Sequence, residues 1–294
     1  MSDIGGQAVI EGVMMRNKNK VATAVRLPNK KIKIKKQRLK PRSKFLKLFF
    51  IRGIINLIDM LTLGIKTLMW SADQQTGEEE KISKTEITIT VILSLAFGIG
   101  LFLFLPYLFT YLLGFKELIN PLLFNIIYGT IKAGMLVLYL YLISFMKDIR
   151  RVFQYHGAEH KVVFCYENKK SLTPENIKKF ITAHPRCGTS FLIIVILVSV
   201  ILFSFIPLIV QNIYPAINSI HWLLRRVILF ACRLLLLPVV AGFSYEILKF
   251  GAKHQDNIIF RALTLPGLWV QKLTTKEPTK KQIEVATRAL KSVL

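Results

Sequence analysis

The sequence predicts an α-helical membrane protein that carries a small antiparallel β-sheet on its cytoplasmic side. Of the 294 residues 52% are hydrophobic, yet Lys and Arg outnumber Asp and Glu by 24. Soluble domains seldom combine so much apolar content with so large a charge, and a soluble nucleic-acid-binding domain would explain only the charge. Four apolar stretches, each long enough to cross a bilayer, complete the prediction. The three cysteines have no paired spacing, which argues against a disulfide scaffold.

The N-terminal region, residues 1–43, lacks the basic and then apolar pattern of a signal peptide. Ala8–Met15, Val21–Leu27 and the partly alternating Lys31–Leu39 predict an antiparallel sheet of two or three strands. The last of these runs is strongly basic and has no aromatic residues that would stack on bases. We therefore expect it to contact anionic membrane lipids, not nucleic acid.

Residues 44–70 are apolar but carry a polar residue every three to five positions, which indicates an amphipathic helix at the membrane interface. The polar positions are Lys44, Lys47, Arg52, Asn56, Asp59, Thr62 and Lys66. The alternative is a fifth span, which would place the basic N-terminus outside the cell, against the positive-inside rule. Residues 71–87 are interpreted as a linker.

Four transmembrane helices are predicted, in two hairpins that cover residues 88–146 and 190–248. The apolar stretches are Thr88–Phe115, Pro121–Met146, Ser190–Tyr214 and Trp222–Phe243. Residues 1–87 contain 18 Lys and Arg, residues 147–189 contain 9 and residues 249–294 contain 9, whereas the hairpin tips together contain one, Lys116. This asymmetry places both termini and the middle segment in the cytoplasm.

The two later cytoplasmic segments are residues 147–189 and 249–294. The first is expected to continue the second transmembrane helix and then to form a short helix over Thr173–Ala183. The second is expected to pass through a turn-rich loop around Pro266. It then ends in a helix that begins with a capping box, Thr279 and Gln282.

The best candidates for chemistry are His156 and His160, which stand one turn apart on a helix with Glu159 beside them. Two imidazoles at this spacing can bind one zinc ion, and a nearby carboxylate can act as a general base. The order His-x-x-Glu-His is also that of inverted zinc peptidases. The alternative is two interfacial histidines that hydrogen-bond to backbone or lipid headgroups, and Gly157 weakens the helix that the metal site requires.

A second pair, His184 and Cys187, directly precedes the third span. Both are zinc ligands at a compatible spacing, and they lie on the same predicted membrane face as the first pair. Four such ligands would close a structural zinc site, and three would leave an open catalytic position. The alternative is a helix-entry turn with a small buried cysteine.

Two cations, Lys132 and Arg233, fall within predicted spans that contain no Asp or Glu. A central cation in a membrane is costly. We therefore expect partners among backbone carbonyls, Glu246 at the end of the fourth span, or the phosphate of an anionic lipid. Alternatively, each side chain extends along its helix so that the charged end reaches the membrane interface.

Several blocks of the chain resemble the YqhQ-like family of uncharacterised bacterial membrane proteins. They are Gly5–Arg16, Tyr155–Lys161, His184–Phe191, Pro266–Pro278 and Gln282–Ala286. The resemblance implies a protein of the bacterial cytoplasmic membrane, and some members are described by inference as metal-dependent enzymes. All blocks fall in predicted cytoplasmic segments, so the resemblance adds Glu11 as a further carboxylate for the candidate site.

The leading functional hypothesis is a metal-dependent hydrolase that acts on a membrane-embedded or lipid-linked substrate at the inner membrane face. His156, His160 and His184 or Cys187 would bind a divalent metal, zinc above others, and Glu159 would be the general base. One alternative is a non-enzymatic membrane-biogenesis factor or scaffold that docks a membrane-protein client. Another is a small transporter built on Lys132 and Arg233, which would require an oligomer.

Overall fold

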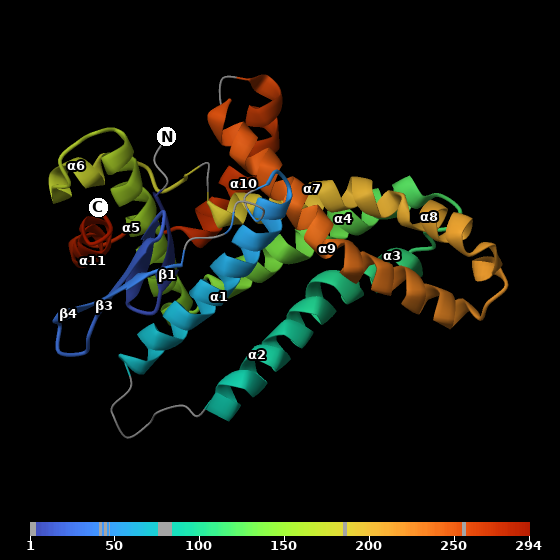
Figure 1. Cartoon of the computed structure of the whole chain (residues 1–294), viewed down its shortest axis with the longest axis horizontal. Coiled ribbons are helices and arrows are strands. Elements are labelled where there is room, and N and C mark those ends of the chain that lie inside the picture. Colours follow the sequence, from blue (N-terminus) through green and yellow to red (C-terminus); the bar gives the residue numbers. More distant parts are fainter. Residues whose placement is uncertain are drawn as a thin grey trace.

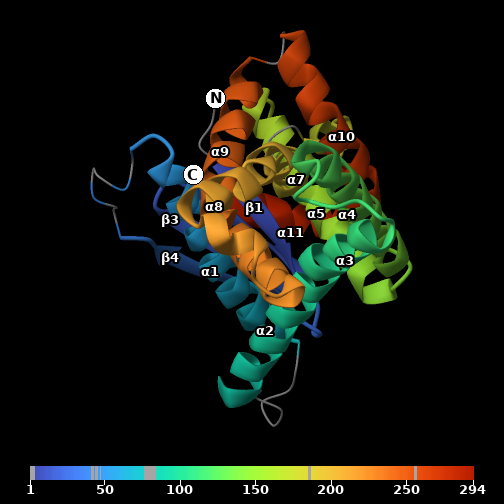
Figure 2. The same ribbon diagram turned by 90° about the vertical axis from the view of Figure 1, so that its right-hand side faces the viewer.

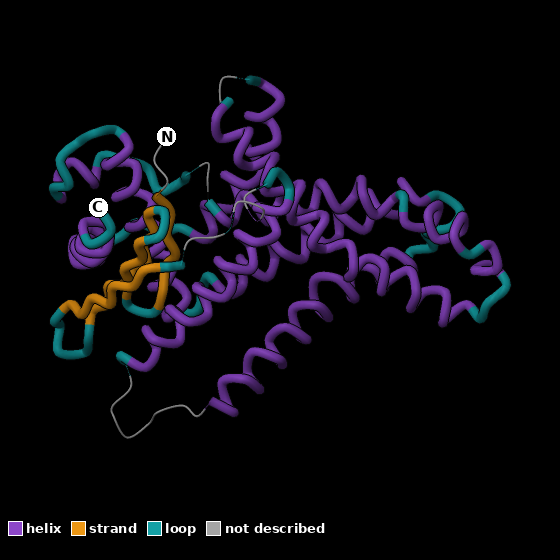
Figure 3. Tube along the Cα trace, viewed as in Figure 1, coloured by secondary structure: helices purple, strands orange, loops and turns teal. Residues whose placement is uncertain are grey.

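The chain folds into a helical bundle with a four-stranded sheet packed at one end (Figures 1–3). The computed structural model describes residues 4–40, 43, 46, 48–75, 84–184, 187–254 and 257–294. The helical class and the N-terminal antiparallel sheet are confirmed. Lys44 and Lys47, which begin the predicted amphipathic stripe, lie outside the described residues.

The sheet has four strands, one more than the upper prediction. They are β1 (Ile4–Val9), β2 (Gly12–Asn17), β3 (Lys20–Arg26) and β4 (Ile32–Arg38), each antiparallel to the next. The predicted strand Ala8–Met15 is wrong because the chain reverses within it, at Ile10 and Glu11, and Val9 pairs with Gly12. Glu11 makes the tight turn with a φ of 52°, a conformation that sequence periodicity does not reveal.

Helices cover both faces of the sheet, which explains why β2 and β3 are apolar on both sides. Val13 and Met15 pack against α5 (Lys147–Glu167) and α11 (Lys280–Lys291). Met14, from the opposite face, packs in a second cluster with Leu63 of α1 (Ile51–Asp73). The predicted capping box is present at the start of α11, with Thr279 and Gln282 as its members.

Five helical stretches in the described residues are long and apolar enough to cross a membrane, where the sequence analysis predicted four. They are Ile51–Asp73, Thr88–Leu112, Pro121–Ile143, Gly188–Ile213 and Trp222–Gly251. The additional one is α1, which the sequence analysis assigned to the interface. This helix also runs past residue 70 into the predicted linker.

Two of the five apolar stretches are interrupted at positions that their sequences explain. The second stretch consists of α2 (Lys84–Ile99), a π-helical turn at Gly100–Phe104 and α3 (Leu105–Leu112), and the π turn immediately precedes Pro106. A proline has no N–H to donate and crowds the preceding turn, which widens the helix there. The fourth stretch likewise divides at Phe205 into α7 (Gly188–Ser204) and α8 (Ile206–Ile213), and Pro207 lies in the first turn of α8.

Two expectations about the connecting segments are wrong. The segment after α4 (Pro121–Ile143) does not continue that helix, because Met146 is extended and α5 starts afresh at Lys147. The turn-rich loop around Pro266 is in fact a helix, α10 (Ile258–Thr274). The short predicted helix is present as α6 (Pro174–Lys178). A 3-10 turn, Pro215–Asn218, leads into the long helix α9 (Trp222–Lys253).

Candidate metal centre

Helix α5 places His156 and His160 on one face, as their spacing predicts, with ring centroids 4.4 Å apart. Gly157 lies within this helix and does not interrupt it. A Cβ atom at this position would lie 2.1 Å from the carbonyl oxygen of Lys276, which belongs to the segment after α10. Glycine therefore allows that segment to approach α5 beside the two histidines.

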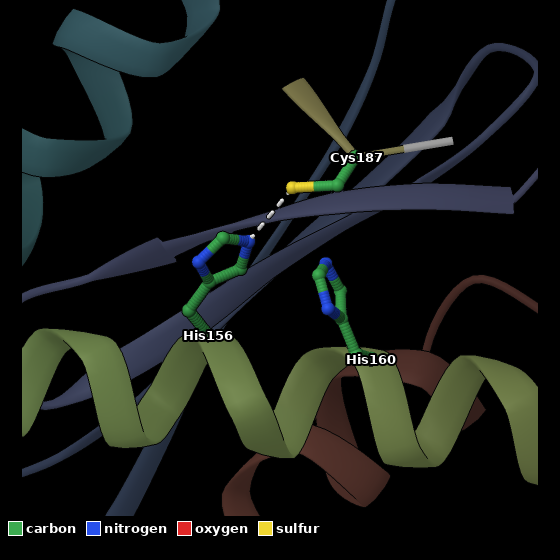
Figure 4. Close-up of side chains that lie close together, drawn as sticks. All are labelled: His156, His160 and Cys187. Atoms are coloured by element: carbon green, nitrogen blue, oxygen red, sulfur yellow. Dashed lines mark hydrogen bonds between the residues drawn. The ribbon is translucent and has the colours of Figure 1, made fainter. Parts of the chain in front are cut away.

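The third member of the site, Cys187, comes from the N-cap of α7. Its Sγ lies 3.2 Å from Nε2 of His156, and the backbone N–H of Thr189 donates to the sulfur at 3.4 Å. Figure 4 shows both imidazoles rising from α5 toward this thiol. One ligand atom from each of His156, His160 and Cys187 lies within 4.8 Å of the others. Ligands of one tetrahedral zinc ion are separated by about 3.3–3.6 Å, so these three atoms would have to draw together by about 1 Å to share one ion.

Backbone carbonyls orient both imidazoles toward the shared centre. Nδ1 of His156 donates to the carbonyl oxygen of Thr274 at 2.9 Å, and Nδ1 of His160 donates to the carbonyl oxygen of Thr182. A carbonyl can only accept, so the proton of each neutral imidazole resides on Nδ1 and the Nε2 lone pair remains available. This is the usual outer arrangement around metal-binding histidines. Burial lowers the pKa of His160, which favours the neutral form that binds metal.

His184 lies beside this group but outside it. Its ring centroid is 5.5 Å from that of His160, and its Nε2 contacts a carboxylate oxygen of Glu167 at 3.3 Å. Within the described part of the chain, the three-residue group does not include His184. The structure thus brings together three of the four ligands that the sequence analysis named.

Glu159 is buried on α5 and faces strand β1. A Cβ atom on Gly6 would lie 2.9 Å from the carboxylate of Glu159, so glycine provides the space for this side chain. Burial raises the pKa of Glu159 to about 7, although His156 and the backbone of Gly6 oppose the shift. Its Oε2 has no hydrogen-bond partner among the described residues. A carboxylate that changes protonation near neutral pH is suited to general acid–base work.

Glu11, which the family resemblance suggested as a further site carboxylate, is engaged elsewhere. Both of its oxygens contact the guanidinium of Arg151 at 2.6 Å, and the hydroxyl of Tyr155 donates to it at 3.4 Å. This bidentate pair ties the turn between β1 and β2 to the first half of α5. It has a structural role that the sequence analysis did not anticipate.

Lys132 and Arg233 lie in the helical bundle, where α3, α4 and α9 pack together, and are not part of the histidine group. Arg233 has a protein partner that the sequence analysis missed, because Glu117 in the loop before α4 accepts from it at 2.7 Å. Glu246, one of its predicted partners, pairs instead with Arg52 of α1. Glu117 was missed because it lies just beyond the predicted span and packs back toward the bundle.

Sequence reasoning also missed the residues that hold the ligands in place. Thr182 and Thr274 accept hydrogen bonds through their backbone carbonyls, which every type of residue has, so the sequence does not distinguish these two positions. Gln271 of α10 binds the segment before Cys187, since its side chain accepts from the N–H of His184 and donates to the carbonyl of His184 and to the hydroxyl of Ser190. Gln271 is fully buried, and its three bonds are long-range, so spacing along the chain could not reveal them.

Comparison with known proteins places these residues in a family. The chain is 36% identical over 308 residues to the uncharacterized protein YqhQ of Bacillus subtilis (strain 168), and the match covers 99% of this chain and 92% of that protein. No solved structure matches. Residues 48–294, which include all three members of the histidine and cysteine group, match the model of the family described as "Protein of unknown function (DUF1385)". The chain therefore belongs to the DUF1385 family.

Proposed function

We propose that this protein binds one zinc ion, or a similar divalent metal, through His156, His160 and Cys187. The observation that carries the proposal is the convergence of these ligand atoms within 4.8 Å, with both Nδ1 atoms held by carbonyls. Two neutral imidazoles and a thiolate suit zinc. The N-terminus of α7 adds support, because its partial positive charge favours a negative sulfur at the N-cap.

The proposed reaction is metal-dependent hydrolysis. A zinc ion with three protein ligands has a fourth position open, at which it lowers the pKa of water and polarises a substrate. Glu159, buried and able to change protonation near pH 7, is the proposed general base. It immediately precedes His160, so α5 fixes it relative to the ligands.

The substrate class proposed is a membrane-embedded or lipid-linked molecule. Cys187 caps α7, which starts a helical stretch apolar enough to cross a membrane. A metal at Cys187 would therefore lie at the level where that helix enters the bilayer. The excess of Lys and Arg in the segments around the site favours the cytoplasmic face of a bacterial membrane.

Metal analysis of the full-length protein, purified in mild detergent, tests the site. Wild type should contain about one zinc per chain, and both His160→Ala and Cys187→Ser should lose it. The matched controls are His254→Ala, an exposed histidine, and Cys165→Ser, a buried thiol whose hydrogen bonds go to backbone oxygens. Both should retain the metal. A metal-free wild type that zinc does not stabilise would refute the site.

One observation favours a second candidate, a structural zinc site in a scaffold protein. The ring of His184 lies 5.5 Å from that of His160, so a side-chain rotation could make it a fourth ligand. Two variants separate the candidates. Glu159→Gln should keep the metal but fail to complement a deletion strain if the protein is a hydrolase, whereas full complementation indicates a scaffold. His184→Ala should keep the metal if three ligands suffice.

A further inference from the structure

A second polar cluster lies inside the helical bundle, built around Arg233. The side chain is 2% exposed, and its terminal nitrogens donate to Glu117 at 2.7 Å and to Asn125 at 2.9 Å. Four aromatic rings surround the guanidinium carbon at 4.9–5.4 Å, namely Tyr107, Phe124, Tyr128 and Phe203. The hydroxyl of Tyr107 donates to Glu117 at 3.1 Å, so this carboxylate is bound from two sides.

The cluster contains one cation more than it has carboxylates. Glu117 balances Arg233, but Lys132 is also buried, with 7% of its surface exposed. Its Nζ lies 5.7 Å from the centre of the Tyr128 ring and forms no hydrogen bond or ion pair with any residue that the structure describes. The same Tyr128 ring also contacts Arg233. A cation–π contact alone does not replace the solvation that a buried ammonium loses.

Two further donors in the cluster also lack an acceptor. The hydroxyl of Tyr128 and Nε of Arg233 are buried, and in the described part of the chain neither has a hydrogen-bond partner. The two buried orphan groups are thus one N–H donor and one hydroxyl, and the ammonium of Lys132 lies beside the same tyrosine ring. Buried polar groups are rarely left unpaired. What the cluster lacks is an acceptor, and a negatively charged one would also balance the surplus cation.

The surroundings restrict the size of that acceptor. Lys132, Arg233 and the four rings are each at most 8% exposed, which leaves no room for a lipid headgroup to enter. A pocket of about 200 Å³ lies at the adjacent hairpin tip and is lined by Gly114, Lys116, Asn120 and Phe124, among others. Phe124 lines this pocket and is also one of the four rings around Arg233. The pocket therefore approaches the cluster from the surface.

We propose that Lys132, Tyr128 and Arg233 bind a small monovalent inorganic anion, such as chloride, inside the bundle. The anion would accept from the ammonium and the tyrosine hydroxyl and would neutralise the surplus charge. This site is separate from the histidine group and does not depend on the proposed hydrolase.

Thermal unfolding in detergent tests the proposal. Unfolding is measured in sodium gluconate, whose anion is too large to fit between the four rings, and in buffers in which bromide or chloride replaces gluconate at constant ionic strength. The unfolding midpoint of wild type should rise by about 2–5 °C when the small anion reaches ten times its Kd. Lys132→Met should abolish this rise, whereas Lys147→Met, which removes an exposed cation at the start of α5, should retain it.

A second variant and a crystallographic experiment also test the anion site. If Lys132→Met fails to fold, Tyr128→Phe keeps the ring, removes only the orphan hydroxyl and should weaken the response. Bromide soaked into crystals should give an anomalous peak beside Lys132. An equal response in gluconate, or an undiminished response in Lys132→Met, would overturn the site. A response restricted to membranes that contain anionic lipid would assign the charge to a lipid phosphate and likewise overturn it.

Discussion

At the scale of single residues, the candidate metal centre depends on Gly157, because no side chain fits at this position. The residue follows His156 directly, and a Cβ there would lie 2.1 Å from the carbonyl oxygen of Lys276. The backbone N–H of Lys276 in turn donates to the carbonyl of Phe153 at 2.9 Å. Thr274, whose carbonyl orients His156, is only two residues away from this contact. Gly157 therefore connects helix packing to imidazole orientation.

We expect Gly157→Ala to destabilise the protein, although alanine favours helices. The overlap must force the segment after α10 away from α5, at a cost of about 1–3 kcal/mol in the free energy of unfolding. Zinc content should fall with it, since the carbonyl of Thr274 moves too. Gly134→Ala is the control, because a Cβ there meets no atom within 4 Å. It should leave stability unchanged or increase it by up to about 1 kcal/mol. An unchanged zinc content in Gly157→Ala would contradict this role.

The candidate ligands could be named from the sequence, and the residues that support them could not. The pairs His156 and His160, and His184 and Cys187, have ligand spacings that chemistry makes recognisable in any sequence. Spacing could not decide which member of the second pair reaches the first. That choice depends on how Cys187 is placed relative to His184, whose carbonyl accepts from the N–H of Cys187 at 3.2 Å. The thiol of Cys187 lies against His156, while His184 contacts Glu167.

At the scale of secondary structure, α10 fixes the position of α7 and with it Cys187. Gln271 forms three hydrogen bonds across this contact, with the N–H and carbonyl of His184 and with Ser190. Gly267, one turn earlier, allows close packing, because a Cβ there would lie 2.6 Å from Ser190. The two residues thereby hold both ends of the segment that carries the cysteine.

We expect Gln271→Leu to weaken the metal site from a distance. The N–H of His184 would remain buried without an acceptor, at a cost of about 1–3 kcal/mol in the free energy of unfolding. Zinc affinity should fall about 10–100-fold, the range seen when an outer support of a ligand is lost. Competition with a zinc chelator measures this. Ser190→Ala removes only one of the three bonds and should have a smaller effect. Equal zinc affinities in Gln271→Leu and wild type would refute the role of α10.

Elements with a strong local pattern were predictable from the sequence, and elements that depend on packing were not. The capping box of Thr279 and Gln282 fixed the start of α11 correctly. In contrast, Pro266 and Gly267 suggested a loop but lie within α10, where contacts with α7 outweigh the local cost of both residues. The turn at Glu11 was missed because a single residue of positive φ divides one apolar run into two strands.

At the scale of the whole molecule, the main question is the orientation of α1 relative to the other apolar helices. Its first turn packs near the end of α9, where a Cβ on Gly53 would lie 3.0 Å from the backbone of Gly242. Its last turns contact the sheet, and the hydroxyl of Ser71 accepts from the N–H of Ile10 at 3.1 Å. The helix thus extends from α9 to the sheet (Figure 1).

The interfacial position of α1 stays a prediction, because its length and hydropathy match those of a spanning helix. The C-terminal part of α9 leads through α10 to α11, and α11 packs on the same sheet as α1. The distribution of Lys and Arg favours the interfacial position, since residues 1–87 contain 18 and the hairpin tips together only Lys116.

We expect topology reporters to place both ends of α1 in the cytoplasm. GFP, which fluoresces only inside, and alkaline phosphatase, which is active only outside, would be fused after residues 80, 118, 170 and 218 and at the C-terminus. Fusions after residues 80 and 170 and at the C-terminus should fluoresce, and those after 118 and 218 should show phosphatase activity. An N-terminal epitope tag should also be protected from external protease in intact spheroplasts, and its digestion would instead mean that α1 crosses the membrane. In that case the contacts between α1, α9 and the sheet could not all lie on the cytoplasmic side, and the metal centre would need a different placement.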